Sequence, residues 1–200
     1  MLQYILSESE RFSVGELTQM AIEGGCLWIN LSLPNVDSAQ IRTMLVPDVI
    51  AMCRESGTIL TIDDRPELAR DLGLHGVRFT AKYFVANPTT SPVQLRELLG
   101  PEAIIGVETA DVSSLNAIVN ADADFICLPA NLTLIECRQF IDNAHAQNVA
   151  IPIVAQGNIN ADNVAQYLSE GFSGIAIERQ ITDAEDPTQE LAKILNAISA

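Results

Sequence analysis

Short apolar segments alternate eight times with amphipathic segments of helical spacing along the 200 residues, and this alternation most constrains the fold. The apolar segments are rich in Val, Ile and Leu, as strands buried on both faces are. They occupy residues 2–6, 27–33, 58–62, 76–80, 103–108, 125–128, 151–155 and 174–177. Because a single helical segment separates each strand from the next, we expect neighbouring strands to be parallel.

Eight strands and eight helices joined by right-handed crossovers predict a closed (β/α)8 barrel, a TIM barrel, forming one domain over residues 1–200. The alternative is an open doubly wound sheet, which usually carries a glycine-rich turn after its first strand. Residues 7–10, Ser-Glu-Ser-Glu, offer no such turn, so the barrel is favoured.

Several helix boundaries carry local signals. Ser13 and Glu16 have the spacing of a capping box, which predicts a helix after Ser13. A long helical stretch follows from about Asp37 to Glu55, and we expect a break at Val46-Pro47, because a residue before proline disfavours the helical conformation. Residues 81–90 stay open between a loop and a strand extension followed by a loop.

Composition narrows the classes of partner. The chain has 11 basic and 26 acidic residues, a formal net charge of −15. A chain this acidic repels nucleic-acid backbones and anionic membrane surfaces, so we expect neither as a partner. A small phosphorylated molecule can still bind, because a few local cations suffice. The sequence leaves open whether the protein forms a homodimer.

The cysteines indicate reduced thiols in a cytoplasmic protein. None of Cys26, Cys53, Cys127 and Cys137 forms a Cys-x-x-Cys pair, so we expect small buried residues rather than a zinc site. The N-terminal residues lack the basic region of a signal peptide. No apolar run reaches the roughly 18 residues that a membrane span needs.

A barrel of this kind places its site at the carboxyl ends of the strands. Polar residues follow nearly every predicted strand and form a candidate ring around that end. His75 lies just before a strand, at the opposite end, and is expected to be structural. The ring comprises Asn30, Ser32, Asp63, Asp64, Arg65, Arg78, Thr80, Glu108, Thr109, Pro129, Asn131, Gln156, Gly157, Asn158, Glu178 and Arg179.

Three charged residues of this ring raise specific alternatives. Asp63 and Asp64 are adjacent, so their side chains point to opposite faces of a strand. Asp64 is either an oxygen ligand for Mg²⁺ or a cap for the following helix paired with Arg65. Arg78 at an inward position needs a partner, and Asp63 or Glu108 can supply one.

Phosphate groups in such barrels often sit between the loops after strands seven and eight. Residues 157–160, Gly-Asn-Ile-Asn, are the candidate cradle, and Arg179 can add charge. The alternatives are that Gly157 is only a turn residue and that Glu178 and Arg179 form a solvated pair.

Four stretches together resemble the thiamine phosphate synthase family, which includes thiazole tautomerases. Residues 62–77 resemble the family's I-N-D-R…D-L-A…G…G-V-H stretch, and residues 104–107 its I-I-G-V-S strand. Residues 123–126 resemble A-D-Y-I, and residues 151–176 resemble P-V-V-A-I-G-G-I-N…G-A-x-G-V-A-V. The resemblance implies a (β/α)8 barrel that joins a pyrimidine pyrophosphate to a thiazole phosphate, with Mg²⁺ on the pyrophosphate.

Carried onto this sequence, the resemblance places Asp64 on Mg²⁺. Arg78 and Lys82 would contact the pyrophosphate, and Gly157 and Asn158 the thiazole phosphate. At other positions the sequence departs from the family's motifs. Its Q-x-R-x-K strand reads Asn-Leu-Ser-Leu-Pro here, and H-x-G-Q-x-D reads Arg-Phe-Thr-Ala-Lys-Tyr, without an acid. Its T-x-T-K run and its double glycine are also replaced.

Three functions follow from these matches and departures. The first is a synthase-like transferase of thiamine metabolism with an altered active site. The second is a non-catalytic binding or regulatory paralogue that keeps the phosphate cradle. The third is a different enzyme on the same barrel, such as a tautomerase, with Glu108 or Glu178 as general base. We therefore take as catalytic candidates Arg78, Lys82 and Glu108, as the metal ligand Asp64, and as ligand-binding candidates Asn30, Ser32, Asp63, Arg65, Asn131, Gly157, Asn158 and Arg179.

Overall fold

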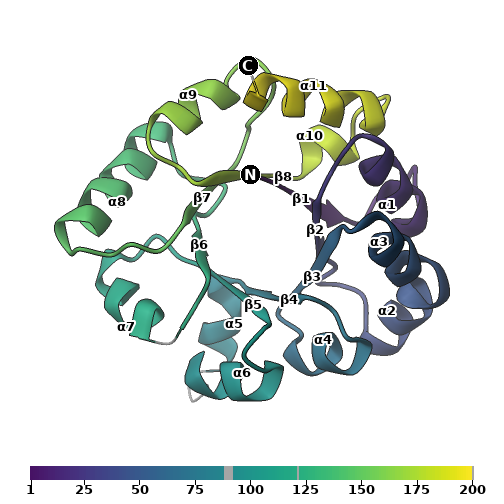
Figure 1. Ribbon diagram of the computed structural model, residues 1–200, viewed down its shortest axis with the longest axis horizontal. Coiled ribbons are helices and arrows are strands. Elements are labelled where there is room, and N and C mark those ends of the chain that lie inside the picture. The colour runs from purple at the N-terminus through teal and green to yellow at the C-terminus, as the bar shows by residue number, and fades with distance from the viewer. Residues whose placement is uncertain (88–91, 121, 200) are drawn as a thin grey trace.

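Eight parallel strands close into a barrel with the helices outside it, as expected (Figure 1). A computed structural model describes residues 1–87, 92–120 and 122–199. Each strand pairs with its neighbours in sequence, and β8 returns to pair with β1. The strands are β1 (Leu2–Ser7), β2 (Trp28–Ser32), β3 (Ile59–Asp63), β4 (Gly76–Phe79), β5 (Ile104–Glu108), β6 (Phe125–Cys127), β7 (Ile153–Gln156) and β8 (Gly174–Ile177).

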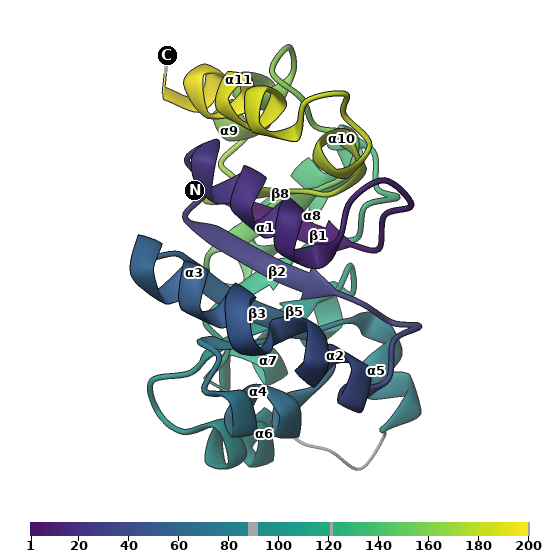
Figure 2. The same ribbon diagram turned by 90° about the vertical axis from the view of Figure 1, so that its right-hand side faces the viewer.

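The side view shows the first three strands running in one direction, with α1 and α3 lying over them (Figure 2). None of the helices in the described ranges is long and apolar enough to cross a membrane. The helices are α1 (Val14–Glu23), α2 (Ser38–Met44), η1 (Leu45–Val49), α3 (Ile50–Ser56), α4 (Pro66–Leu72), α5 (Ala81–Ala86), α6 (Pro92–Leu99), η2 (Val112–Ser114), α7 (Leu115–Asn120), α8 (Leu134–Ala146), α9 (Val164–Ser169), α10 (Arg179–Thr182) and α11 (Pro187–Ser199).

The capping box before α1 is confirmed. The Ser13 side chain accepts the Glu16 backbone N–H at 3.2 Å, and the Ser13 backbone N–H donates to the Glu16 carboxylate at 2.8 Å. The expected break at Val46-Pro47 is wrong, because η1 is a π-helical turn that joins α2 to α3. The Ile50 N–H donates to the Leu45 carbonyl, so one widened turn passes the proline without ending the helix.

Residues 81–87 also differ from expectation, because α5 is a helix rather than a loop or strand extension. The rest of that unassigned stretch, residues 88–90, lies outside the described residues. Thr80 precedes α5 with extended backbone angles but makes no side-chain cap of its own. The short helix α10 after β8 was not expected either.

Side chains that point inward from alternate strand positions fill the barrel. Trp28 and Phe125 meet edge to face with ring centroids 5.2 Å apart. Gly106 makes room for them, since a Cβ there would overlap the Phe125 ring. The other members of this inner cluster are Ile5, Cys127, Val154 and Ala176. All four cysteines are buried and free, as expected.

Candidate functional site

A chain of hydrogen bonds rises through the barrel interior toward the carboxyl ends of the strands. The Trp28 indole donates to Thr61 Oγ1 at 3.0 Å, and the Thr61 hydroxyl donates to Asn30 Oδ1 at 2.8 Å. Asn30 Nδ2 in turn donates to Asp63 Oδ1 at 2.8 Å. Because Asn30 is fully buried below the mouth, it orients Asp63 from beneath.

Asp63 and Arg78 form a buried, two-pronged ion pair at the top of this chain. Arg78 donates to the two carboxylate oxygens through Nε at 2.8 Å and Nη2 at 2.7 Å. Its Nη1 donates to Gln156 Oε1 at 3.0 Å across the barrel. Burial opposes the charge, but Asp63 outweighs it and raises the pKa of Arg78. The partner expected from sequence is confirmed, and three of the five guanidinium N–H groups are committed to oxygen atoms of the protein.

Asp64 follows β3 and holds the start of α5 through Thr80. Its backbone is left-handed at φ +56°, and its carboxylate accepts the Thr80 backbone N–H at 2.7 Å and the Thr80 hydroxyl at 2.6 Å. The expectation that Asp64 caps α4 and pairs with Arg65 is wrong, because the N-terminal position of α4 has no side-chain cap. Burial raises the pKa of Asp64, and the bonds from Thr80 oppose that shift.

Arg65 forms hydrogen bonds with residues 33–38, the segment that follows β2. Its Nη2 donates to the carbonyls of Leu33 at 3.1 Å and Val36 at 2.6 Å, and its Nη1 donates to Ser38 Oγ at 3.3 Å. The guanidinium therefore holds one wall of the mouth while lining it.

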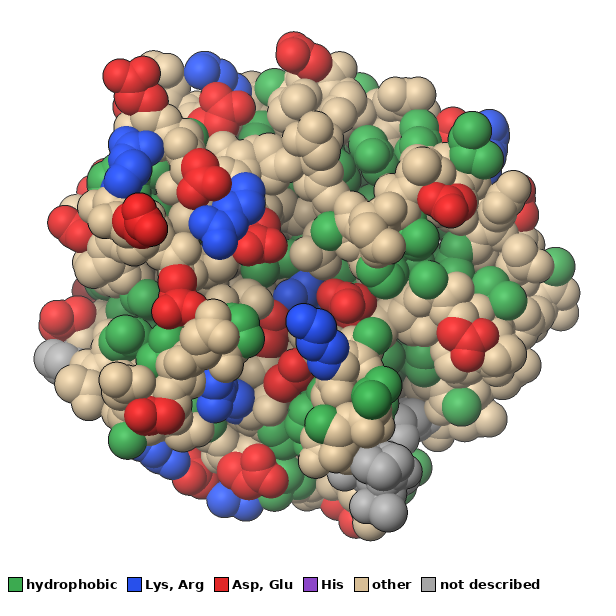
Figure 3. Space-filling model, turned by 180° about the vertical axis from the view of Figure 1, so that it is seen from behind, with side chains coloured by type: hydrophobic (Ala, Val, Ile, Leu, Met, Phe, Trp, Pro, Cys, Tyr) green, Lys and Arg blue, Asp and Glu red, His purple; other side chains and the backbone are tan. Residues whose placement is uncertain are grey.

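A cavity of about 440 Å³ opens at the carboxyl ends of the strands. Figure 3 looks onto this end, and basic and acidic side chains lie together near its centre. Ten residues predicted for the site line the cavity, which extends from β2 to β8. The lining consists of Ser32, Leu33, Pro34, Asp63, Asp64, Arg65, Arg78, Thr80, Lys82, Glu108, Gln156 and Glu178.

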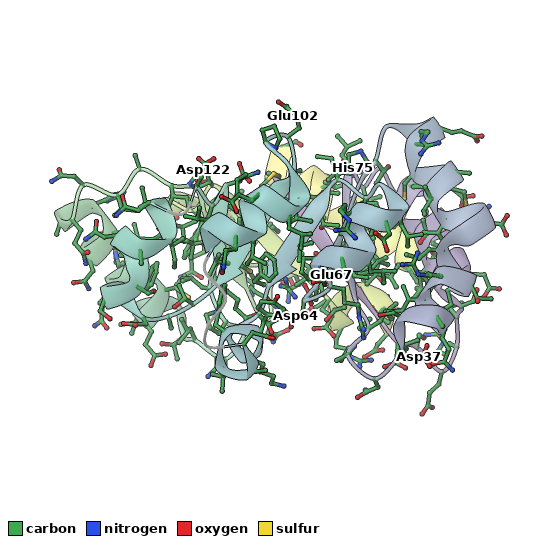
Figure 4. The ribbon with its side chains drawn as sticks, turned by 90° about the horizontal axis from the view of Figure 1, so that it is seen from below. Asp37, Asp64, Glu67, His75, Glu102 and Asp122 are labelled. Carbon is green, nitrogen blue, oxygen red and sulfur yellow. The ribbon has the colours of Figure 1, made fainter. Side chains whose placement is uncertain are left out.

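Figure 4 shows the two ends of the barrel on opposite sides of the view. Asp64 and Asp37 lie on one side, while His75, Glu102 and Asp122 lie on the other. His75 accepts the Leu60 backbone N–H at Nδ1, 3.0 Å away, which confirms its structural role at the end remote from the cavity.

The proposed phosphate cradle lies outside the cavity lining. Gly157 has φ +145°, and its carbonyl accepts Gln180 Nε2 at 3.1 Å. The same amide donates to Asn158 Oδ1 at 3.0 Å, which ties the loop after β7 to α10. Asn131 is exposed, and Arg179 is largely exposed beside Glu178 and Asp183. Their phosphate-binding role stays a prediction.

Glu108 is the half-buried acid of the cavity. Burial raises the pKa of its carboxyl, while Arg78 and the Ala81 amide oppose the shift. Glu108 makes no ion pair with any residue in the described ranges. A carboxyl with a raised pKa is a candidate for proton exchange with a bound ligand.

The acids at the mouth do not fit a magnesium site built from protein carboxylates. Both oxygens of Asp63 accept from Arg78, and both oxygens of Asp64 accept from Thr80. Within the described ranges, no three His, Cys, Asp or Glu side chains are grouped to hold a metal ion. We therefore derive no step through Mg²⁺, and Asp64 as its ligand stays a prediction.

The sequence indicated Asp63 as a partner of Arg78 but not the other hydrogen bonds of the site. Gln156 and Thr80 were placed at strand ends, but their bonds to Arg78 and Asp64 cross between strands and were not foreseen. Alternation along β4 and β7 could have indicated that Arg78 and Gln156 both face inward. No local signal points to Leu33 and Pro34.

The structure is a single (β/α)8 barrel with a cavity lined mainly by polar and charged residues at the carboxyl ends of its strands. The family model described as thiamine monophosphate synthase matches residues 3–181. The chain therefore belongs to the thiamine monophosphate synthase family.

One curated relative agrees with this membership, and two solved structures share the fold. The thiamine-phosphate synthase of Bacteroides thetaiotaomicron is 30% identical over 207 residues, which cover 98% of this chain and 96% of that protein. The solved thiamine phosphate pyrophosphorylase from Pyrococcus furiosus superposes with a TM-score of 0.82 at 22% identity, covering 98% of this chain and 95% of the other. The corresponding structure from Bacteroides thetaiotaomicron superposes at 0.70 with 14% identity, covering 100% and 98%.

Proposed function

We propose that this barrel binds and acts on a small phosphorylated ligand of the thiazole or pyrimidine type in thiamine metabolism. The observation that carries the proposal is the polar cavity at the strand ends, which gathers Arg78, Lys82 and Glu108 in a member of this family. Lys82 is exposed on α5 and makes no ion pair among the described residues, so its charge is available to a phosphate. The loop at Gly157 and Asn158 is the second candidate for phosphate contact.

One candidate reaction within this class is proton transfer, as in a tautomerase, with Glu108 as general base. The specific observation is its half-buried carboxyl with a raised pKa. Transfer chemistry on a pyrophosphate is the second candidate, supported by the relatives named thiamine-phosphate synthase. Against it, Arg78 is already paired with Asp63, so it offers few donors to a pyrophosphate.

Calorimetric titration tests the binding step. We expect thiazole phosphate to bind, and Lys82→Ala to weaken it about tenfold, since a charge-assisted contact contributes roughly 1.5 kcal/mol. Lys193→Ala on α11 is the matched control, because these are the two lysines of the chain. Absence of binding by both thiazole phosphate and pyrophosphate with Mg²⁺ would remove the proposal.

Turnover then separates the candidate reactions. Solvent deuterium entering the thiazole ring, with loss on Glu108→Gln, supports proton transfer. Condensation of a pyrimidine pyrophosphate with thiazole phosphate, and its loss in Arg78→Ala, supports the synthase reaction instead. Binding without either turnover identifies a non-catalytic paralogue.

A further inference from the structure

An apolar groove adjoins the polar cavity on its α5 side. It lies between α5 and α7 and encloses about 440 Å³. Its apolar lining includes Phe84, Val85, Ala117 and Ile118, and Val85 is 82% exposed. Binding of a ligand that covers such an open apolar surface next to a cavity is favourable, because it removes apolar area from water.

Glu108 belongs to both compartments. It lines the polar cavity with Lys82 and Gln156, and it also lines the groove with Ala117 and Ile118. This side chain therefore lies at the boundary between the two compartments.

The carboxylate of Glu108 forms no ion pair in the described part of the chain, although the charge of Arg78 acts on it. The nearby Arg78 is committed through three N–H groups to Asp63 and Gln156. Burial makes the ionised form of this carboxyl costly and raises its pKa, and Arg78 and the Ala81 amide offset only part of that cost. A positively charged or N–H-donating ligand atom would remove that cost.

A second acid, Asp111, adds negative charge to the groove. Asp111 is exposed, and its carboxylate accepts the Ser113 backbone N–H at 2.9 Å and the Ser113 hydroxyl at 2.7 Å. These bonds lower the pKa of Asp111, so it stays ionised at neutral pH. The groove thus combines an apolar surface with two acids and contains no Lys, Arg or His among its described lining residues.

We propose that this groove binds the apolar ring of a small nitrogen-containing cation, with the nitrogen against Glu108. The ligand of the proposed function would then be bipartite, with its phosphate in the cavity and its ring extending toward α7. Only this last placement rests on the proposed function, because the groove and its acids would bind an apolar ammonium compound without any phosphate.

The test uses three probes titrated into the isotope-labelled protein and followed by NMR. Benzylammonium carries ring and charge, methylammonium only the charge, and benzyl alcohol only the ring. We expect benzylammonium to bind at least tenfold more tightly than either, with the largest shift changes at Ala81, Glu108 and Ala117. Shift changes centred elsewhere would overturn the proposal.

Variants that fill the groove locate the site. Ala117 is exposed on α7, so Ala117→Leu and Ala117→Phe should fold and reduce benzylammonium affinity in that order, about three-fold and tenfold. Ala165→Phe on the exposed face of α9 is the matched control and should leave affinity unchanged. If Ala117→Leu, Ala117→Phe and Ala165→Phe all bound benzylammonium with equal affinity, the ligand would not lie in this groove.

Glu108→Gln should weaken the binding of benzylammonium several-fold and leave the affinity for benzyl alcohol unchanged. If the affinity for benzylammonium also stayed unchanged, Glu108 would have no role in binding the cation. The same proteins are titrated with thiazole phosphate. Benzylammonium binding without thiazole phosphate binding would refute the proposed function while supporting the groove, and the reverse result would refute only the groove. Concentration-dependent self-association blocked by Ala117→Phe, without probe binding, would assign the surface to a second copy instead.

Discussion

At the scale of single residues, the buried pair of Arg78 and Asp63 dominates the energetics of the barrel mouth. Arg78 is 3% exposed and Asp63 is 8% exposed. Sequence alone predicted that Arg78, at an inward position, needs an acid such as Asp63 or Glu108, because a buried charge without a partner is costly. It could not predict the third partner, Gln156, which is 78 residues away and approaches only when the barrel closes.

Removing one member of this pair should be far worse than removing both. Arg78→Met leaves a buried carboxylate without its partner and should lower the free energy of unfolding by about 3–5 kcal/mol. The double variant Asp63→Leu/Arg78→Met should recover most of that loss. Urea denaturation measures both, and a loss below about 1 kcal/mol in the single variant would contradict the burial described here.

Glu108 should make stability depend on pH in a particular direction. Its pKa is raised in the folded protein, so the folded state binds more protons than the unfolded state. This group therefore stabilises the fold less as pH rises through its unfolded pKa, near 4.5, and beyond. We expect Glu108→Gln to gain stability relative to wild type as the pH rises above about 4.5, measured by urea denaturation. A difference that stays constant with pH would refute the assignment.

At the scale of elements, boundaries set by neighbouring residues were predictable. Ser13 and Glu16 mark the start of α1, and Gly73 ends α4 in the left-handed conformation, as their types indicate. The helix α5 was missed because its beginning is held by Asp64, 16 residues earlier. The π-turn before α3 was missed because a proline ordinarily indicates a break.

The bond between Asp64 and Thr80 should control the order of α5. Asp64→Ala removes two hydrogen bonds of the charge-assisted kind and should accelerate amide exchange across residues 81–86, at a cost of about 1–3 kcal/mol. Asp64→Asn keeps an acceptor and tolerates the left-handed backbone, so its effect should be intermediate. Hydrogen exchange with mass spectrometry gives the readout, and α8 is the internal reference. Unchanged exchange in α5 would show that other contacts hold it.

At the scale of the whole molecule, the alternation of strands and helices was enough to predict a closed barrel. What fills the barrel was not predictable, because layers of side chains from alternate strands interlock only after closure. Phe125 occupies the space that a side chain at position 106 would need, and a glycine in a strand carries no sign of which neighbour uses its space.

Gly106→Ala should therefore strain the barrel interior. The added Cβ overlaps the Phe125 ring and should lower stability by about 1–3 kcal/mol. Replacing the Phe125 ring with a smaller side chain, in Gly106→Ala/Phe125→Leu, should restore part of the lost stability. Gly15→Ala on α1 meets only Ser13 Oγ at 4.0 Å and should be neutral or stabilising. Thermal unfolding compares them, and equal midpoints for the position-106 and position-15 variants would be inconsistent with this packing.

The pairing of β1 with β8 has a consequence for synthesis on the ribosome. Leu2 meets Ile175, so the first strand to be made waits about 170 residues for its second neighbour. Until then the nascent chain exposes an unpaired edge with apolar residues on both faces, a surface that invites association with other chains. Cellular yield should therefore depend on translation speed and on chaperones that cover strand edges, more than the stability of the finished barrel would suggest.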